Sequence, residues 1–136
     1  MTSPTETVRE FLRARGCARH VVDGGVAGLA TAWARFADEV AAGYAAGLDD
    51  YRNDCDGRQI LADVLTAVAA DAFARERARV AAADATVKAA TAPFAASIWG
   101  TKVAATSGWG PRRNWWYFRA PVRGGDELAA DLAKVH

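Results

Sequence analysis

Aromatic and basic side chains gather toward the C-terminus of the 136-residue chain. Seven of its aromatic residues fall between Phe94 and Phe118, and residues 102–123 carry five Lys or Arg and no acid. Trp and Tyr supply contact area and Arg supplies directed hydrogen bonds, a mixture enriched in protein interaction sites. This predicts binding of an acidic protein partner, or of a small molecule, through exposed members of the set Trp109, Arg112, Arg113, Trp115, Tyr117 and Arg119.

The same segment has a second interpretation, which is packing. Dense aromatic side chains can fill the grooves left by small residues on an alanine-rich bundle, with arginines stacked on the outer ring faces. We expect some side chains of the segment to pack in the core and others to lie at the surface, where they can bind a partner.

Acidic side chains are concentrated earlier in the chain, where residues 37–63 hold seven acids against Arg52 and Arg58. Carboxylate oxygens are the ligands that magnesium and manganese prefer. The alternative function is therefore a metal-dependent hydrolase, with Arg58 or Arg119 steadying an anionic substrate. Its metal ligands would be Glu39, Asp49, Asp50 and Asp54.

Helix capping explains these acids more simply, because Asp and Asn accept hydrogen bonds from the free N–H groups at a helix start. We therefore expect Asp54 or Asp56 to cap a helix, and no bound cofactor. A calcium loop is disfavoured, since its first ligand position is Arg52 and its twelfth is Asp63 rather than Glu. The acidic and basic segments are expected to face each other or to be solvated.

Few residues are suited to nucleophilic catalysis. Cys17 and His20 are three positions apart and would share a helix face, but no orienting partner accompanies them. The sequence contains no P-loop, and its glycines do not follow a strand as a dinucleotide fingerprint requires. A non-enzymatic binding or protein-interaction module is therefore the leading hypothesis for function.

Composition narrows the setting of that function. The net charge of +1 and the acidic segment disfavour nucleic acid, and charges interrupt every apolar run that would cross a membrane. Cys17 and Cys55 fit no disulfide or metal spacing, so we expect a cytoplasmic protein with free thiols. With 51% hydrophobic residues and no linker, residues 1–136 are expected to form one helical domain, whose oligomeric state the composition does not fix.

The elements that must position these residues are mostly helices. Ser3 and Pro4 predict a helix start, and Gly16 its end. A second helix is expected from about Asp23 to Gly47, after a separate short turn over 18–22. Its apolar stripe is Val26, Leu29, Trp33, Phe36, Val40 and Tyr44.

Three further elements complete the expected fold. A third helix follows the polar residues 48–57, and a fourth runs from about Asp71 to Ala90, with Pro93 beyond it. Residues 114–119 are predicted to be extended or β, and a last helix to begin with Asp126 as its cap.

The fold class is therefore mainly α, a bundle of four to five helices with a short extended or β segment near the C-terminus. The residues expected to be buried lie on the apolar stripes of their helices. They are Phe11, Leu29, Trp33, Phe36, Val40, Leu61, Val64, Leu65 and Val68.

Overall fold

The first helix begins as its sequence predicts. In the computed structural model, which describes residues 2–136, helix α1 spans Pro4–Ala14. The Ser3 hydroxyl accepts a hydrogen bond from the Glu6 N–H at 3.2 Å, and Pro4 occupies the first helical position. A free donor of the first turn is thereby satisfied.

Helix α2 (Arg19–Ala42) is the central helix, and Gly25 interrupts it near its start. Gly25 has φ 59° and ψ −152°, a conformation that residues with a Cβ rarely adopt, so the helix kinks there. The predicted end at Gly47 is wrong, because Gly43 leaves the helix with φ 117°. Tyr44 then donates its N–H to the Arg123 carbonyl, which ties this connection to the C-terminal region.

Helix α3 (Leu48–Thr66) begins earlier than the sequence predicts. Asp54 and Asp56 lie inside the helix, so the prediction that one of them caps it is wrong. Leu48, Tyr51 and Cys55 are buried on one side of these first turns, and that burial outweighs the weak helix propensity of the Asp and Asn residues around them.

Helix α4 (Ala74–Ala90) follows a tight turn in which Phe73 adopts a left-handed conformation with φ 59°. Arg77 holds this turn together, since its guanidinium donates to the carbonyls of Leu65, Ala69 and Ala72. These carbonyls lie near the end of α3 or just beyond it, so one side chain fixes the α3–α4 connection.

The C-terminal region contains five short elements, which are two strands, two α-helices and one 3-10 helix. Strand β1 (Thr91–Pro93) pairs antiparallel with β2 (Arg119–Pro121), and between them lie helix α5 (Thr101–Ser107) and the 3-10 helix η1 (Trp115–Phe118). Residues 114–119 are thus largely helical rather than extended, and α5 was not expected from the sequence. Helix α6 (Asp126–Leu132) is preceded by Gly125, so Asp126 is not its cap.

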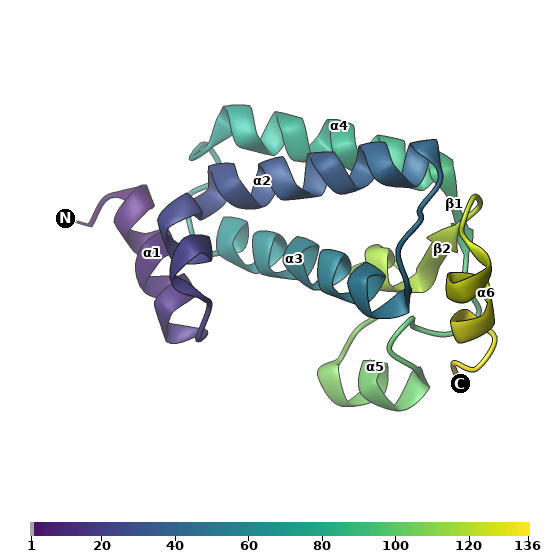
Figure 1. Ribbon diagram of the computed structural model, residues 1–136. Helices are drawn as coiled ribbons and strands as arrows, with labels where there is room; N and C mark the ends of the chain where they lie inside the picture. The colour runs from purple at the N-terminus through teal and green to yellow at the C-terminus, as the bar shows by residue number, and fades with distance from the viewer. Residues whose placement is uncertain (1) are drawn as a thin grey trace.

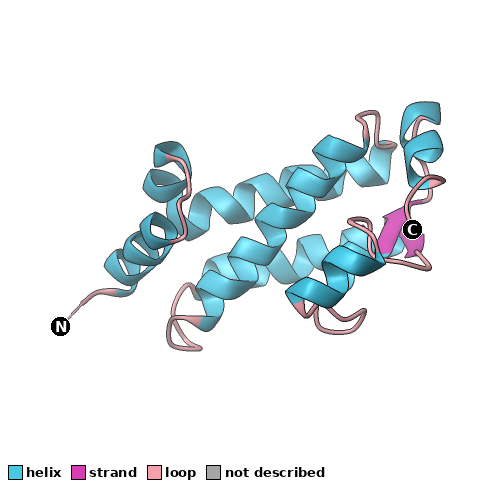
Figure 2. Ribbon diagram, turned by 90° about the horizontal axis from the view of Figure 1, so that it is seen from below, coloured by secondary structure: helices cyan, strands magenta, loops and turns pink. Residues whose placement is uncertain are grey.

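The long helices lie side by side, as Figure 1 shows: α2 packs against α1, α3 and α4, and α3 runs antiparallel to α2. The two strands lie at the end opposite the N-terminus and close to the C-terminus (Figure 2). The described chain is 66% helical, which confirms the mainly α class and the small β element near the C-terminus. No helix within residues 2–136 combines the length and apolar character needed to cross a membrane.

One cluster of side chains forms the core. Trp33, Phe36, Val40, Leu61 and Val64 are buried, as predicted. The other four predicted core residues are partly exposed and pack against the cluster: Phe11, Leu29, Leu65 and Val68.

An ion pair lies within this core. Arg58 of α3 meets Asp84 of α4 through two hydrogen bonds of 3.0 and 2.9 Å, and their side chains are only 11% and 18% exposed. The Trp33 indole N–H of α2 donates to the same carboxylate at 2.8 Å. The Arg58 guanidinium also lies over the Trp116 ring, 4.4 Å from its centroid. Three helices and η1 therefore converge on one charge pair.

Replacement of Trp33 tests this core. We expect Trp33→Ala to lower the free energy of unfolding by about 3–5 kcal/mol, because Trp33 is 2% exposed and stacks on Phe36. Trp33→Phe keeps an aromatic ring but removes the donor to Asp84, so its loss should be smaller. Chemical denaturation measures both, and a loss below about 1 kcal/mol for Trp33→Ala would show that Trp33 is not a core residue.

Candidate functional site

An open groove of about 920 Å³ lies between α3 and the region formed by α5, the 108–114 loop and η1. We call it the α3–α5 groove. Helix α3 supplies polar side chains to it, and the C-terminal region supplies most of the aromatic ones. Its lining includes Arg15, Asp56, Gln59, Asp63, Trp99, Trp109, Arg113, Asn114, Trp116 and Tyr117.

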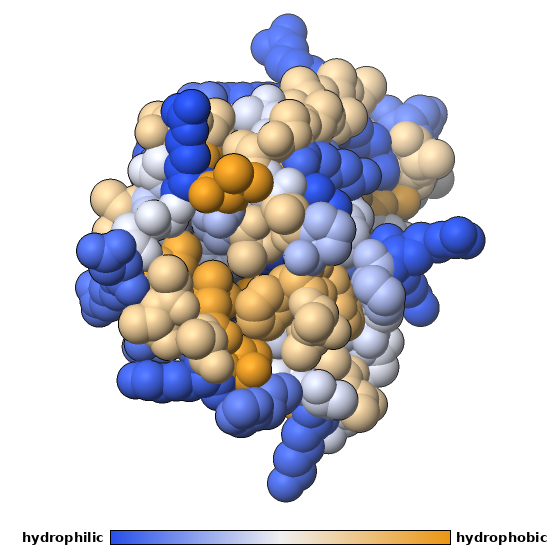
Figure 3. All heavy atoms as spheres, turned by 90° about the vertical axis from the view of Figure 1, so that its right-hand side faces the viewer, coloured by the Kyte–Doolittle hydropathy of each residue, from blue (hydrophilic) through white to orange (hydrophobic). Residues whose placement is uncertain are grey.

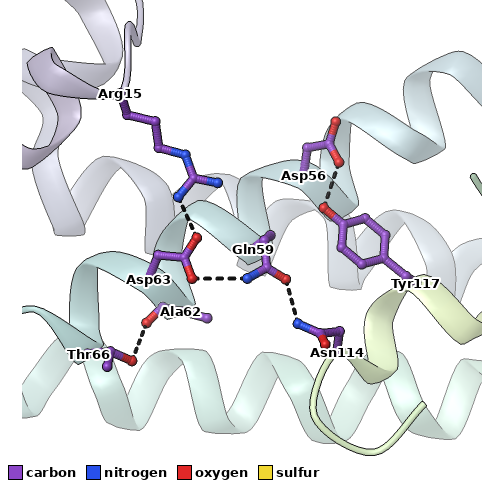
Figure 4. A network of polar contacts seen from close by, with 8 residues as sticks. All are labelled: Arg15, Asp56, Gln59, Ala62, Asp63, Thr66, Asn114 and Tyr117. Atoms are coloured by element: carbon purple, nitrogen blue, oxygen red, sulfur yellow. Dashed lines mark hydrogen bonds and ion pairs between the residues drawn. The ribbon is translucent and has the colours of Figure 1, made fainter. Parts of the chain in front are cut away.

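A chain of hydrogen bonds runs along one wall of the groove (Figure 4). Arg15, just beyond α1, pairs with Asp63, and Asp63 accepts from the Gln59 amide at 3.0 Å. The Gln59 carbonyl oxygen in turn accepts from the Asn114 amide at 2.9 Å. Segments that are distant in sequence are therefore joined by side chains on one face of α3.

The same series of hydrogen bonds fixes the 108–114 loop. Asn114 is 6% exposed, and its carbonyl oxygen accepts the Gly110 N–H at 3.1 Å. Just before Gly110, the indole of Trp109 stacks on the Tyr117 ring, with centroids 3.8 Å apart. The hydrogen bonds of Asn114 therefore hold the loop that carries Trp109, so the stacked rings of Trp109 and Tyr117 are supported by a satisfied polar network.

Asp56 lies at the other end of this α3 face. One carboxylate oxygen, Oδ1, accepts the Tyr117 hydroxyl at 2.7 Å and the Trp99 indole N–H at 3.2 Å. Burial and this bond to Asp56 raise the pKa of Tyr117 well above its usual value. The hydroxyl thus stays protonated and remains a donor to Asp56.

The structure divides the predicted partner-binding residues. Trp109, Arg113 and Tyr117 line the groove, although Tyr117 is only 1% exposed and serves mainly as its floor. Arg112 is exposed next to Arg113. These residues lie in the 108–114 loop or directly after it.

The two remaining predicted residues lie elsewhere. Trp115 contacts Trp33 and Trp116, and the Lys88 ammonium is 4.6 Å from its ring centroid. Arg119 donates to the Thr91 hydroxyl at 2.7 Å and to the Thr91 and Lys88 carbonyls. Its guanidinium therefore anchors β1 and the end of α4.

Sequence reasoning missed half of the groove. Trp99, Gln59 and Arg15 were not candidates, and Asp56 was considered only as a helix cap and as a position of the disfavoured calcium loop. A helix begun at Leu48 would have placed Asp56, Gln59 and Asp63 on one face, since residues three and four apart are neighbours on a helix. Arg15 and Trp99 carry no such signal, because only the tertiary fold brings them to α3.

The four proposed metal ligands do not form one site. Asp49 is fully exposed and lies 3.9 Å from Arg52, whereas Asp54 accepts the Tyr44 hydroxyl at 2.9 Å. Glu39 and Asp50 lie near enough to Asp54 to raise its pKa. Among residues 2–136, no group of three or more His, Cys, Asp or Glu side chains is placed to hold a metal ion. The geometry therefore does not support the hydrolase alternative, and the partial calcium-loop match lies within α3.

Neither cysteine is hydrogen-bonded to a histidine in the described chain. His20 is exposed, and no hydrogen bond joins it to Cys17 within the described chain. Cys55 is buried, and its thiol contacts the Trp116 carbonyl at 3.4 Å. Burial raises the pKa of the Cys55 thiol, so this group is a packing residue rather than a nucleophile.

The acidic and basic segments do pack together, but hydrogen bonds rather than ion pairs join them. Asp56 is bound to Tyr117, and Gln59 to Asn114. None of the ion pairs formed by residues 2–136 links an acid of 37–63 to a base of 102–123. Arg112 and Arg113 are therefore left without acidic partners in the described chain.

A second hollow, of about 470 Å³, lies at the end of the molecule that carries the sheet. It is bordered by small apolar residues and by Val122, which is 67% exposed. Figure 3 views this end and shows apolar side chains gathered over the centre and lower half of the face, with hydrophilic side chains projecting around them. It has no aromatic lining. A further hollow, of about 570 Å³, combines Trp99 with Arg52 and Lys134, whereas the α3–α5 groove combines Arg113 with several aromatic side chains.

Comparison of the chain with protein-family models, with curated proteins and with solved structures finds no match.

The 108–114 loop provides a test of the groove wall. Asn114→Ala would leave the Gln59 oxygen and the Gly110 N–H without partners, which we expect to cost about 1–3 kcal/mol. Hydrogen exchange at the Gly110 amide should quicken, and Ser107→Ala, an exposed change in the same region, should leave it unaltered. Unchanged exchange at Gly110 in Asn114→Ala would contradict the role of this side chain.

The pH dependence of stability tests the environment of Asp54 on α3. Burial raises the pKa of Asp54 above its ordinary value of 3.8, the Tyr44 hydrogen bond opposes that rise, and Glu39 and Asp50 add to it. The folded protein thus retains a proton that the unfolded chain has lost, so ionisation of Asp54 reduces stability as pH rises from 3.8 through the raised pKa.

Asp54→Asn removes that ionisation while an amide oxygen remains for Tyr44. We expect the variant to gain stability relative to wild type at about pH 7 and to lose this advantage at about pH 3, measured by urea unfolding. Asp38→Asn is the control, since Asp38 is exposed. An equal difference between Asp54→Asn and wild type at both pH values would refute the explanation.

Proposed function

We propose that the protein is a non-enzymatic binding module whose α3–α5 groove takes a segment of an acidic partner protein. The observation that carries the proposal is the groove itself, where Trp109 stands beside Arg113 on a loop held by Asn114. Aromatic and arginine side chains on a rigid support are typical of interaction hot spots.

Charge supports a partner with acidic groups. Arg112 and Arg113 are exposed and have no acidic partner within residues 2–136. Because Arg112 lies outside the groove lining, the basic surface extends beyond what a small molecule in the groove would touch. A protein segment uses both parts, whereas a small molecule would use the groove alone.

The proposal also places the protein in the cytoplasm. Cys17 and Cys55 are both free thiols, and reduced cysteines are the rule in that compartment.

Affinity capture from the native host tests the function with matched variants. We expect Arg112→Ala with Arg113→Ala to reduce partner recovery at least about tenfold, since arginines at hot spots contribute most of the binding free energy. Arg119 is left unchanged because it anchors β1. The control is Arg35→Ala with Arg75→Ala, which replaces two exposed arginines, one on α2 and one on α4. Helices α2 and α4 lie on the side of the bundle away from α5 (Figure 1).

Circular dichroism of each variant must first show an unchanged helical spectrum. The proposal fails if wild type and the Arg112, Arg113 variant recover the same proteins in equal amounts. It also fails if the control variant loses recovery to the same extent, because the effect would then reflect total charge alone.

A further inference from the structure

The Asp56 carboxylate has one oxygen that the fold does not use. Oδ1 accepts both the Tyr117 hydroxyl and the Trp99 indole N–H, whereas Oδ2 accepts no hydrogen bond from residues 2–136. Oδ2 is not closed off from solvent, since Trp116 Nε1 is the only buried side-chain N or O atom of the described chain without a partner. Nor does an ion pair join Asp56 to any base of that chain. The groove therefore presents a fixed, unneutralised oxygen.

Aromatic rings stand around this oxygen. Trp99 is bonded to Asp56 directly, and Trp109 is stacked on the Tyr117 ring whose hydroxyl is also bonded to Asp56. Trp99 lines both the groove and another hollow, of about 570 Å³, whose lining includes Arg52, and the Arg52 guanidinium lies 4.7 Å from the centroid of the Trp99 ring. Because Arg52 does not line the groove, the part of this indole that faces the groove is left for another cation.

A carboxylate oxygen framed by Trp and Tyr is a cation-binding arrangement. The carboxylate attracts a guanidinium or ammonium group through charge-assisted hydrogen bonds, and the partly exposed rings of Trp99 and Trp109 offer apolar and cation–π contacts to the rest of that side chain. Asp56 and these two rings are thus complementary to a basic side chain and not to an acid.

The other end of the groove has the opposite preference. Arg113 lines it without an acidic partner, and Arg15 binds Asp63 through one terminal nitrogen only, which leaves its other donors free. Asp56 and Asp63 are seven residues apart on α3, a separation of about 10 Å at 1.5 Å per residue. In a polyproline II segment, which has three residues per turn and rises about 3.1 Å per residue, side chains three positions apart lie on the same face and are separated by about 9 Å.

We propose that the groove binds a peptide segment in polyproline II conformation, with a basic side chain at Asp56 and an acidic side chain three positions away at Arg15 and Arg113. This inference rests on the proposed function and adds to it a cation subsite. A free amino acid does not fit, because its ammonium and carboxylate are far closer together than the two ends of the groove.

Short capped peptides test the subsite. The first probe carries Arg and Glu three positions apart in an Ala, Gly and Ser background, made in both chain orders, and the second replaces its Arg with citrulline, a neutral side chain of the same shape. Binding is followed by NMR through the indole N–H resonances of Trp99 and Trp109. We expect wild type to bind the Arg peptide, in one of the two orders, at least about tenfold more tightly than the citrulline peptide.

Asp56→Asn is the decisive variant, because its amide oxygen can still accept from Trp99 and Tyr117 while a nitrogen donor replaces Oδ2. We expect it to abolish the preference for Arg over citrulline and to leave the melting temperature nearly unchanged. Asp49→Asn is the matched control, since Asp49 is an exposed acid of the same helix outside the groove, and it should keep the preference. If Asp56→Asn does not fold, the wild-type comparison of the two peptides decides alone.

Three outcomes overturn the inference: equal binding of the Arg and citrulline peptides, an unchanged preference in Asp56→Asn, or no binding of either chain order. The first two leave the proposed function standing if binding still requires Arg113. When no peptide binds, the cation subsite is rejected, and the Arg112, Arg113 capture experiment judges the proposed function separately.

Discussion

The structure depends on the largely buried pair of Arg58 and Asp84, whose side chains are 11% and 18% exposed. Removing two charges from water is costly, and their attraction offsets that cost only when the geometry is good and the remaining donors and acceptors are satisfied. Here the pair has two hydrogen bonds of 3.0 and 2.9 Å, a further donor in Trp33 and an aromatic face in Trp116. These contacts come from α2, α3, α4 and η1, so the pair fixes how the helices meet and where the C-terminal aromatics lie.

The shape of the α3–α5 groove depends on how the Arg58–Asp84 pair positions α3 and η1. Arg58 lies over the Trp116 ring, the next residue, Tyr117, reaches Asp56 on the groove side of α3, and both rings line the groove. A 3-10 helix has three residues per turn, so neighbouring side chains point in different directions and can serve the core and the groove at once. The same turn of α3 therefore places Arg58 in the interior and Asp56 in the groove.

Two acidic residues of α3 have aromatic partners. Asp54 accepts from Tyr44, and Asp56 accepts from Tyr117 and Trp99. Hydrogen bonds from hydroxyl and indole groups satisfy a carboxylate without neutralising its charge, which is how Asp56 stays available to a cation. Asp56, for which the sequence suggested capping, instead joins the helix to the C-terminal aromatic segment.

The sequence by itself determined the features that depend on neighbouring residues. Ser3 and Pro4 set the start of α1, and the stripe through Trp33, Phe36 and Val40 set the buried face of α2. The mainly α class followed from this periodicity. Only the tertiary structure decided the early start of α3, the helix α5 and the separation of Trp109 and Arg113 from Trp115 and Arg119. Those outcomes depend on contacts between distant segments, such as Gln59 with Asn114 and Arg119 with Thr91, which no local pattern encodes.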